Sequence, residues 1–84
     1  MTITLWEFTA TDFDAWCELV GSPEVASHAE YMALLAAVQA DLERQGHEVV
    51  RVKMTVAEMR ARLADRGLEN TPDNRAAITA LKDQ

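Results

Sequence analysis

The stretch Pro23–Gln45, PEVASHAEYMALLAAVQADLERQ, is the longest helical pattern in the chain and the element against which the rest has to pack. Ser22 is a suitable N-cap, Pro23 suits the first helical position, and Gly46 can adopt the left-handed conformation that ends a helix. Together these signals predict one helix of about six turns.

This predicted helix is apolar on two sides. At about 100° per residue, the large side chains gather on one broad face that we expect to form the floor of the core: Tyr31, Leu34, Leu35, Val38 and Leu42, with Val25 and Met32 at its edge. Small side chains form a stripe on the opposite side: Ala26, Ala29, Ala33, Ala36, Ala37 and Ala40. A helix that is apolar on two sides is usually covered on both.

Two interpretations of this alanine stripe stay open. In the first, alanine raises helix propensity and the small side chains lie beneath the preceding helix. In the second, the small side chains let another backbone approach closely, which makes the stripe a self-association surface in a homodimer.

The length of 84 residues predicts a single domain, residues 1–84, with a narrow stability margin of about 3 to 5 kcal/mol. Cys17 is the only cysteine, so an internal disulfide and a cysteine-based zinc cluster are excluded. A partner subunit is the remaining source of extra stability.

No segment has the length of a membrane span, and the first residues lack the pattern of a signal peptide. We therefore expect a cytoplasmic protein that does not bind membranes.

Charge divides the chain into two unequal halves. Residues 1–43 contain eight acidic residues and no lysine or arginine, and all eight basic residues lie from Arg44 onward, so the halves carry −8 and +2. The net charge of −6 favours encounter with basic partners. The simpler interpretation is that the acidic residues only keep the protein in solution.

The segments around the long helix have shorter signals. TITLWEF (residues 2–8) alternates as a strand does, and Thr11, with Asp14 three residues later, is expected to cap a helix of about nine residues that Gly21 closes. Phe13, Trp16, Cys17 and Val20 form the apolar stripe of that helix.

The second half of the chain predicts one more strand and two helices. In HEVVRVKM (residues 47–54), Val50, Val52 and Met54 share one face of the strand. TVAE (residues 55–58) is a capping box that opens a helix ending near Arg66, and Thr71 with Pro72 opens a last helix. The predicted fold is therefore α+β and mostly helical, in the order strand, helix, long helix, strand, helix, helix. Helices cover a small two-stranded sheet, and the sequence leaves open whether its strands are parallel or antiparallel.

Few residues have the spacing of a chemical site. Cys17 lies on the same stripe as Phe13 and Trp16, where a free cysteine behaves as a small buried hydrophobe. His28 and His47 are too few for a metal site, and the chain has no glycine-rich phosphate loop and no Ser/His/Asp pattern. We accordingly predict no enzyme activity, no catalytic residues, no metal and no cofactor.

Basic residues of the second half could gather on one surface. The candidate patch consists of Arg51, Lys53, Arg60, Arg62, Arg66 and Arg75. Glu58, Asp65 and Asp73 dilute it, and Glu58 is placed to pair with Arg62 one helical turn away. Nucleic acid binding usually needs several uncompensated cations.

These observations lead to two functional predictions. The first is a non-enzymatic, acidic accessory protein that forms a homodimer and binds a larger basic protein, of a type found on phages, plasmids and other mobile elements of bacteria. The alternative is a dimeric nucleic-acid-binding regulator that uses the basic C-terminal half.

Overall fold

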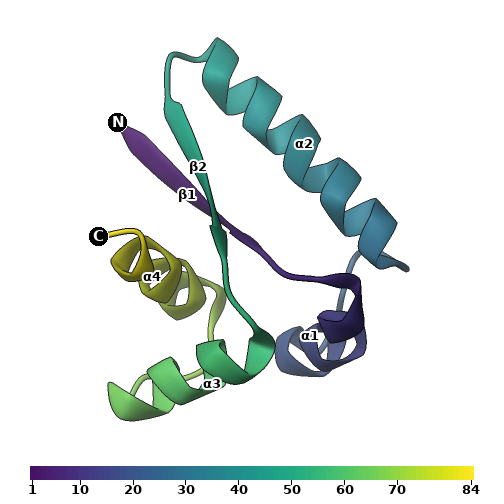
Figure 1. Cartoon of the computed structure of the whole chain (residues 1–84), viewed down its shortest axis with the longest axis vertical. Helices are drawn as coiled ribbons and strands as arrows, with labels where there is room; N and C mark the ends of the chain where they lie inside the picture. Colours follow the sequence, from purple (N-terminus) through teal and green to yellow (C-terminus); the bar gives the residue numbers. More distant parts are fainter.

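The computed structural model describes the whole chain, Met1–Gln84. It confirms the α+β class and the order of the elements (Figure 1). These are β1 (Thr2–Glu7), a 3-10 turn (Ala10–Asp12), α1 (Phe13–Val20), α2 (His28–Arg44), β2 (Glu48–Lys53), α3 (Val56–Asp65) and α4 (Pro72–Lys82).

The two strands are parallel and form the whole sheet, with Thr2 opposite Glu48 and Glu7 opposite Lys53. Parallel strands need a long connection because the chain has to return to the starting end of the sheet. Helices α1 and α2 together make that connection. The crossover settles the strand orientation that the sequence left open.

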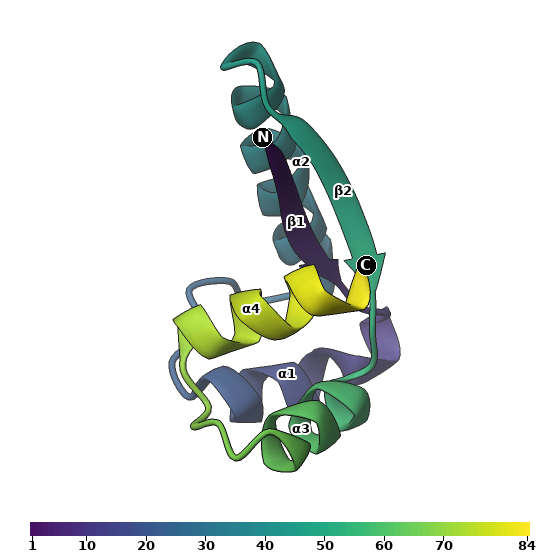
Figure 2. The same ribbon diagram turned by 90° about the vertical axis from the view of Figure 1, so that its left-hand side faces the viewer.

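The sheet is covered by α2 on one face and crossed by α4 on the other (Figures 1 and 2). On the first face, Arg51 of β2 donates a hydrogen bond from Nε to Oε1 of Gln39 in α2, at 2.8 Å. Trp6 and its register partner Val52 lie on the face toward α4 and are buried. Helix α4 crosses only the half of the sheet near the carboxyl ends of the strands (Figure 2).

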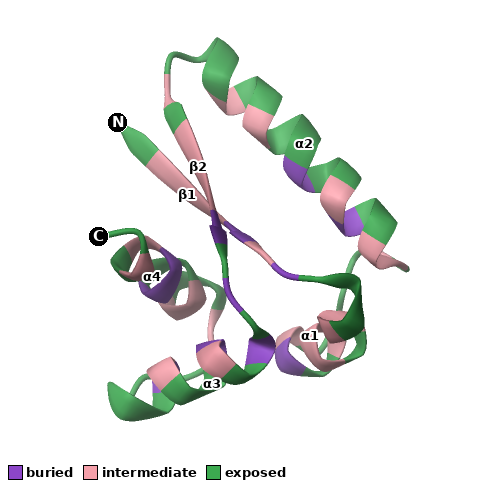
Figure 3. Ribbon diagram, in the orientation of Figure 1, coloured by how far each residue is buried: buried purple, intermediate pink, exposed green.

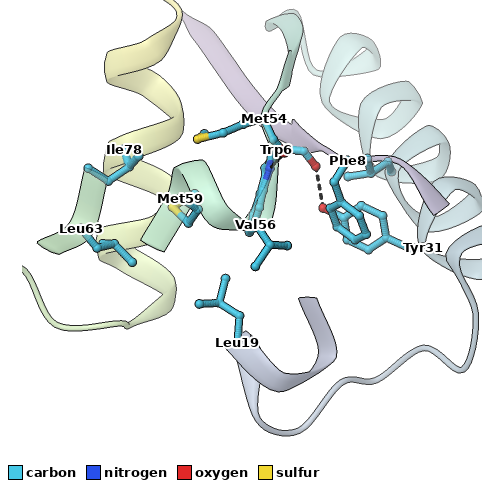
Figure 4. Packing of buried hydrophobic residues seen from close by; sticks show 10 residues of the cluster. Trp6, Phe8, Leu19, Tyr31, Met54, Val56, Met59, Leu63 and Ile78 are labelled. Atoms are coloured by element: carbon cyan, nitrogen blue, oxygen red, sulfur yellow. Dashed lines mark hydrogen bonds between the residues drawn. The ribbon is translucent and has the colours of Figure 1, made fainter. Parts of the chain in front are cut away.

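The hydrophobic core lies where the carboxyl ends of the strands meet the helices (Figures 3 and 4). Met59 and Ile78 are its most completely buried side chains. Trp6 joins the two strands because its indole Nε1 donates to the carbonyl oxygen of Met54 at 2.8 Å. The core consists of Trp6, Phe8, Leu19, Tyr31, Leu35, Met54, Val56, Met59, Leu63 and Ile78.

Helix α2 begins five residues later than predicted. Its N-cap is Ser27, whose side chain accepts a hydrogen bond from the Glu30 N–H at 3.1 Å. The Glu30 carboxylate reaches back to the N–H of Ala26 at 2.7 Å. This exchange resembles a capping box, and it satisfies the N–H groups of Ala26 and Glu30. Ala26 therefore precedes the helix and is not part of its alanine stripe.

The capping predicted for α1 is wrong in its details. Thr11 lies in the 3-10 turn and its hydroxyl bonds to that of Thr9 at 2.8 Å. Asp12 occupies the N-cap position, but its carboxylate accepts instead from the N–H of Val56, at 2.8 Å. The deeply buried residue of α1 is Leu19, which the predicted stripe omitted, whereas Cys17 is only half-buried.

The caps of the last two helices are confirmed. Thr55 accepts from the N–H of Glu58 at 3.1 Å, and Thr71 accepts from the N–H of Asn74 at 3.2 Å. The Glu58 carboxylate does not return to the cap as a capping box requires. It bonds to Arg62, as predicted, and also to Lys82 of α4, each at 2.8 Å.

Candidate functional site

The outer edge of β1 carries free backbone groups. Glu48 N–H donates to the Met1 carbonyl and Met54 N–H to the Glu7 carbonyl, each at 3.1 Å. Because alternate residues of a strand face its partner, the odd-numbered residues of β1 face β2. The N–H and C=O groups of Thr2 and Thr4 therefore point away from the sheet, and we call these groups the β1 edge.

Tyr31 closes this edge at one end. Its hydroxyl donates to the carbonyl oxygen of Trp6 at 2.6 Å (Figure 4), and Trp6 is the next residue whose carbonyl points outward. The pKa of Tyr31 is raised to about 12, mainly by burial. The negative charge of Glu7 also raises this pKa, and the positive charge of Arg51 lowers it. The free part of the edge is thus confined to the first half of β1.

The two outer edges of the sheet differ in charge. β1 carries no charged residue before Glu7 at its end, whereas β2 carries Glu48, Arg51 and Lys53. Charged side chains along an edge strand, lysine above all, hinder pairing with another strand. The β1 edge lacks this protection.

An exposed apolar surface adjoins the β1 edge. Leu34 and Val38 follow Tyr31 by three and seven residues, which places them on the same side of α2, above β1. They were predicted to lie in the core, but they are 47% and 37% exposed. The core contact is made instead by Tyr31 and Leu35, because the helix is rotated so that Gln39 and Arg51 meet at β2. We call Leu34 and Val38 the α2 flank.

The alanine stripe faces solvent. Ala29, Ala33, Ala36, Ala37 and Ala40 are all exposed on the outer side of α2 (Figure 3). No part of the chain covers them, so the interpretation that they lie beneath the preceding helix is wrong. Their self-association stays a prediction.

Half of the predicted basic patch is engaged within the chain. Arg51 bonds to Gln39 and to Glu7, Arg62 bonds to Glu58, and Arg75 bonds to the Asn70 side chain. Burial also lowers the pKa of Arg75. The three remaining cations, which form no ion pair in the structure, are Lys53, Arg60 and Arg66.

A cleft of about 540 Å³ opens at the carboxyl ends of both strands. Its wall includes the last residues of the strands, Glu7 and Lys53, together with His28 at the start of α2 and Thr55 at the start of α3. Hydrogen bonds from Lys82 and then Arg62 hold the pKa of Glu58, on the same wall, below its ordinary value. We call this the strand-end cleft.

Neither of these sites was found from the sequence. One signal for the unprotected edge was present in the sequence: TITLW has no charged side chain, whereas EVVRVK has three. The strand-end cleft had no such signal. It is lined by residues from three separate segments (7–10, 28–32 and 53–58), and only the parallel pairing brings Glu7 and Lys53 to the same end.

The structure has no group of three or more His, Cys, Asp or Glu side chains placed to hold a metal ion. None of its helices combines the length and the hydrophobicity that crossing a membrane requires. Comparisons with protein-family models, with curated proteins and with solved structures gave no match.

Proposed function

We propose that this protein is a non-enzymatic protein–protein interaction module that works as a homodimer, in which the β1 edges of two copies pair. The observation that carries the proposal is the uncharged, unpaired β1 edge beside the exposed α2 flank. A two-stranded sheet is marginal by itself, and two such sheets joined edge to edge have four strands.

The backbone groups of the edge fit an antiparallel pair around a two-fold axis at Ile3. Thr2 of one copy would then exchange hydrogen bonds with Thr4 of the other, and the second such pair follows by symmetry. The bond from Tyr31 occupies the Trp6 carbonyl and so disfavours registers in which Trp6 would pair. Glu7 lies beyond the paired segment, so no like charges oppose each other.

The same axis places both α2 helices on one face of the joined sheet. The α2 flank lies on the side of each helix above β1, so Leu34 and Val38 of the two copies would fill the space between the helices. The total exposed area of 5272 Å² is ordinary for a monomer of this mass, about 5,000 Å², so the support for a dimer comes from the β1 edge and the α2 flank.

Pairing through β2 has less support. β2 carries Glu48, Arg51 and Lys53, and charged side chains along an edge strand hinder pairing with another strand. Nucleic acid binding also has less support, because three of the six candidate cations are engaged within the chain.

The acidic first half supplies a surface for the basic protein partner that the charge distribution favours. Asp14 and Glu18 on α1 and Glu24 before α2 are exposed and form no ion pair. Helix α1, which carries Asp14 and Glu18, lies beyond the carboxyl end of β1 and away from its first residues (Figure 1), so both copies of a dimer would present these two carboxylates.

The dimer is tested by light scattering behind a sizing column at high micromolar concentration. We expect the wild-type chain to be a dimer and Thr4→Pro to be a monomer, because proline removes an outward N–H and leaves the bonds to β2 intact. Val49→Pro is the matched control, since it removes an outward N–H from β2. Circular dichroism verifies that both variants fold.

A second pair of variants tests the α2 flank. Leu34→Glu should dissociate the dimer, whereas Ala33→Glu, one residue away in the alanine stripe, should not. A wild-type monomer would refute the proposal. Loss of the dimer in Ala33→Glu but not in Leu34→Glu would assign the interface to the alanine stripe instead.

A further inference from the structure

The strand-end cleft has features of a small-ligand site that the proposed dimer does not use. In open sheets with parallel strands, ligands commonly bind outside the carboxyl ends of the strands. The cleft lies at that position, and its volume of about 540 Å³ falls within the range of about 300–1,000 Å³ typical of ligand sites.

The floor of the cleft is apolar and fixed in position. Phe8 and Met54 contribute to it and are each 4% exposed, with the half-buried Met32 beside them. The Phe8 ring is held against the ring of Tyr31, with centroids 4.5 Å apart, and it stacks on Trp16 at 5.4 Å. A ligand with an apolar body would therefore meet a surface that needs little rearrangement.

One cation of the cleft wall has no partner. Lys53 lies directly across from Glu7 in the register, yet the Glu7 carboxylate bonds to Arg51 at 3.2 Å. The other carboxylate of the wall, Glu58, is neutralised by Arg62 and Lys82. The ammonium group of Lys53 is left as the uncompensated charge.

His28 adds a second polar group to the wall. Its Nε2 lies 2.6 Å from the carbonyl oxygen of Phe8. A carbonyl oxygen only accepts hydrogen bonds, so Nε2 carries a proton and donates it. This bond fixes the ring at the rim of the cleft.

We propose that the strand-end cleft binds a small monocarboxylic acid with an apolar body, whose carboxylate pairs with Lys53 and whose body lies on Phe8, Met32 and Met54. A single free cation matches a single negative charge. A phosphate dianion fits less well, because Lys53 is the one unpaired cation of the wall and the floor beside it is apolar. A neutral apolar ligand would cover the ammonium group without giving it a partner, which is unfavourable.

The probe is 4-phenylbutyrate, titrated into the ¹⁵N-labelled full chain, with amide chemical shifts as the readout. We expect saturable shifts at residues that line the cleft, such as Thr9, His28 and Thr55, and much weaker binding of the neutral amide, 4-phenylbutyramide. Lys53→Gln should weaken 4-phenylbutyrate binding about tenfold or more, as expected for loss of a charge-assisted hydrogen bond.

Arg60→Gln is the matched control, because Arg60 is also an exposed cation without an ion pair but lies outside the cleft. It should bind the probe as the wild type does. Met32→Trp, which fills the cleft, should abolish binding while the amide spectrum stays that of a folded chain. Three results would each overturn the proposal. The first is the absence of shifts at about 10 mM probe, a concentration at which a ligand with a Kd of about 1 mM is mostly bound. The others are equal binding of the neutral amide, and inorganic phosphate that causes the same shifts more strongly.

Discussion

The hydroxyl of Tyr31 donates a hydrogen bond of 2.6 Å to the main-chain carbonyl of Trp6, and this contact joins the long helix to the strand that it covers. Tyr31 is also in contact with Phe8 and Trp16, so it belongs to the aromatic cluster of the core. The same bond ends the free part of the β1 edge. One side chain thus links the packing of α2 to the length of strand that a second copy can pair with.

Replacing Tyr31 by phenylalanine should destabilise the chain. The change keeps the ring and leaves the outward carbonyl of Trp6 without its partner, which costs about 1–3 kcal/mol of unfolding free energy. Urea denaturation followed by circular dichroism measures the difference. A variant as stable as the wild type would mean that water or a second copy satisfies the carbonyl.

Stability should fall at high pH because of the same tyrosine. Its pKa is raised from the ordinary value of 10.0 to about 12 in the folded chain, so the unfolded chain loses the phenol proton first. The contribution of Tyr31 is complete below pH 10 and is lost as the pH rises through 12. Other groups titrate in this range as well, so the measured quantity is the stability difference between the wild type and Tyr31→Phe, which should shrink above pH 10.

Asp12 should contribute to stability through a contact distant in sequence. Its carboxylate accepts from the N–H of Val56, the first residue of α3, and so ties the start of α1 to the start of α3. Asp12→Ala should cost about 1–2 kcal/mol, as the loss of a helix cap does. Asp14→Ala is the control, because Asp14 is exposed and forms no ion pair. Equal losses in urea denaturation would contradict this role.

Glu58 should make the chain sensitive to acid. Hydrogen bonds from Lys82 and Arg62 lower its pKa, so its stabilising effect is present above its ordinary value of 4.5 and is lost as the pH falls through the lowered value. Wild type should be more stable than Glu58→Gln at pH 7, and the two should converge in strong acid. Thermal unfolding between neutral and acid pH measures this, with Glu43→Gln, which breaks no ion pair, as the control. A constant difference at every pH would exclude the mechanism.

Local signals predicted the elements well, and tertiary contacts decided the faces. The first strand and the threonine caps of α3 and α4 depend on neighbouring residues alone, and they are where the sequence places them, except that β1 ends at Glu7 and not at Phe8. The inward face of α2 depends on its rotation about its own axis. That rotation is set by Arg51 meeting Gln39 and by Tyr31 meeting Trp6, which are pairs separated by 12 and 25 residues. Periodicity therefore placed Leu34 and Val38 in a core that they only border.

The candidate sites were harder to predict for the same reason. The β1 edge exists only because the sheet ends there, and the strand-end cleft exists only because the strands are parallel. Neither property can be read from the spacing of residues within one element. The alanine stripe, in contrast, was visible in the sequence because it belongs to a single helix.

The start of α2 offers a final prediction, because Ser22 was the predicted N-cap and Ser27 is the observed one. Ser27→Ala should cost about 1 kcal/mol of unfolding free energy, since it removes the acceptor for the Glu30 N–H. Ser22→Ala should change stability by less than about 0.5 kcal/mol, as exposed substitutions away from such contacts usually do. Both variants lose one hydroxyl from the same connecting segment, so their comparison isolates the cap. A larger loss in Ser22→Ala would move the start of the helix back to Pro23, and with it Ala26 would rejoin the alanine stripe.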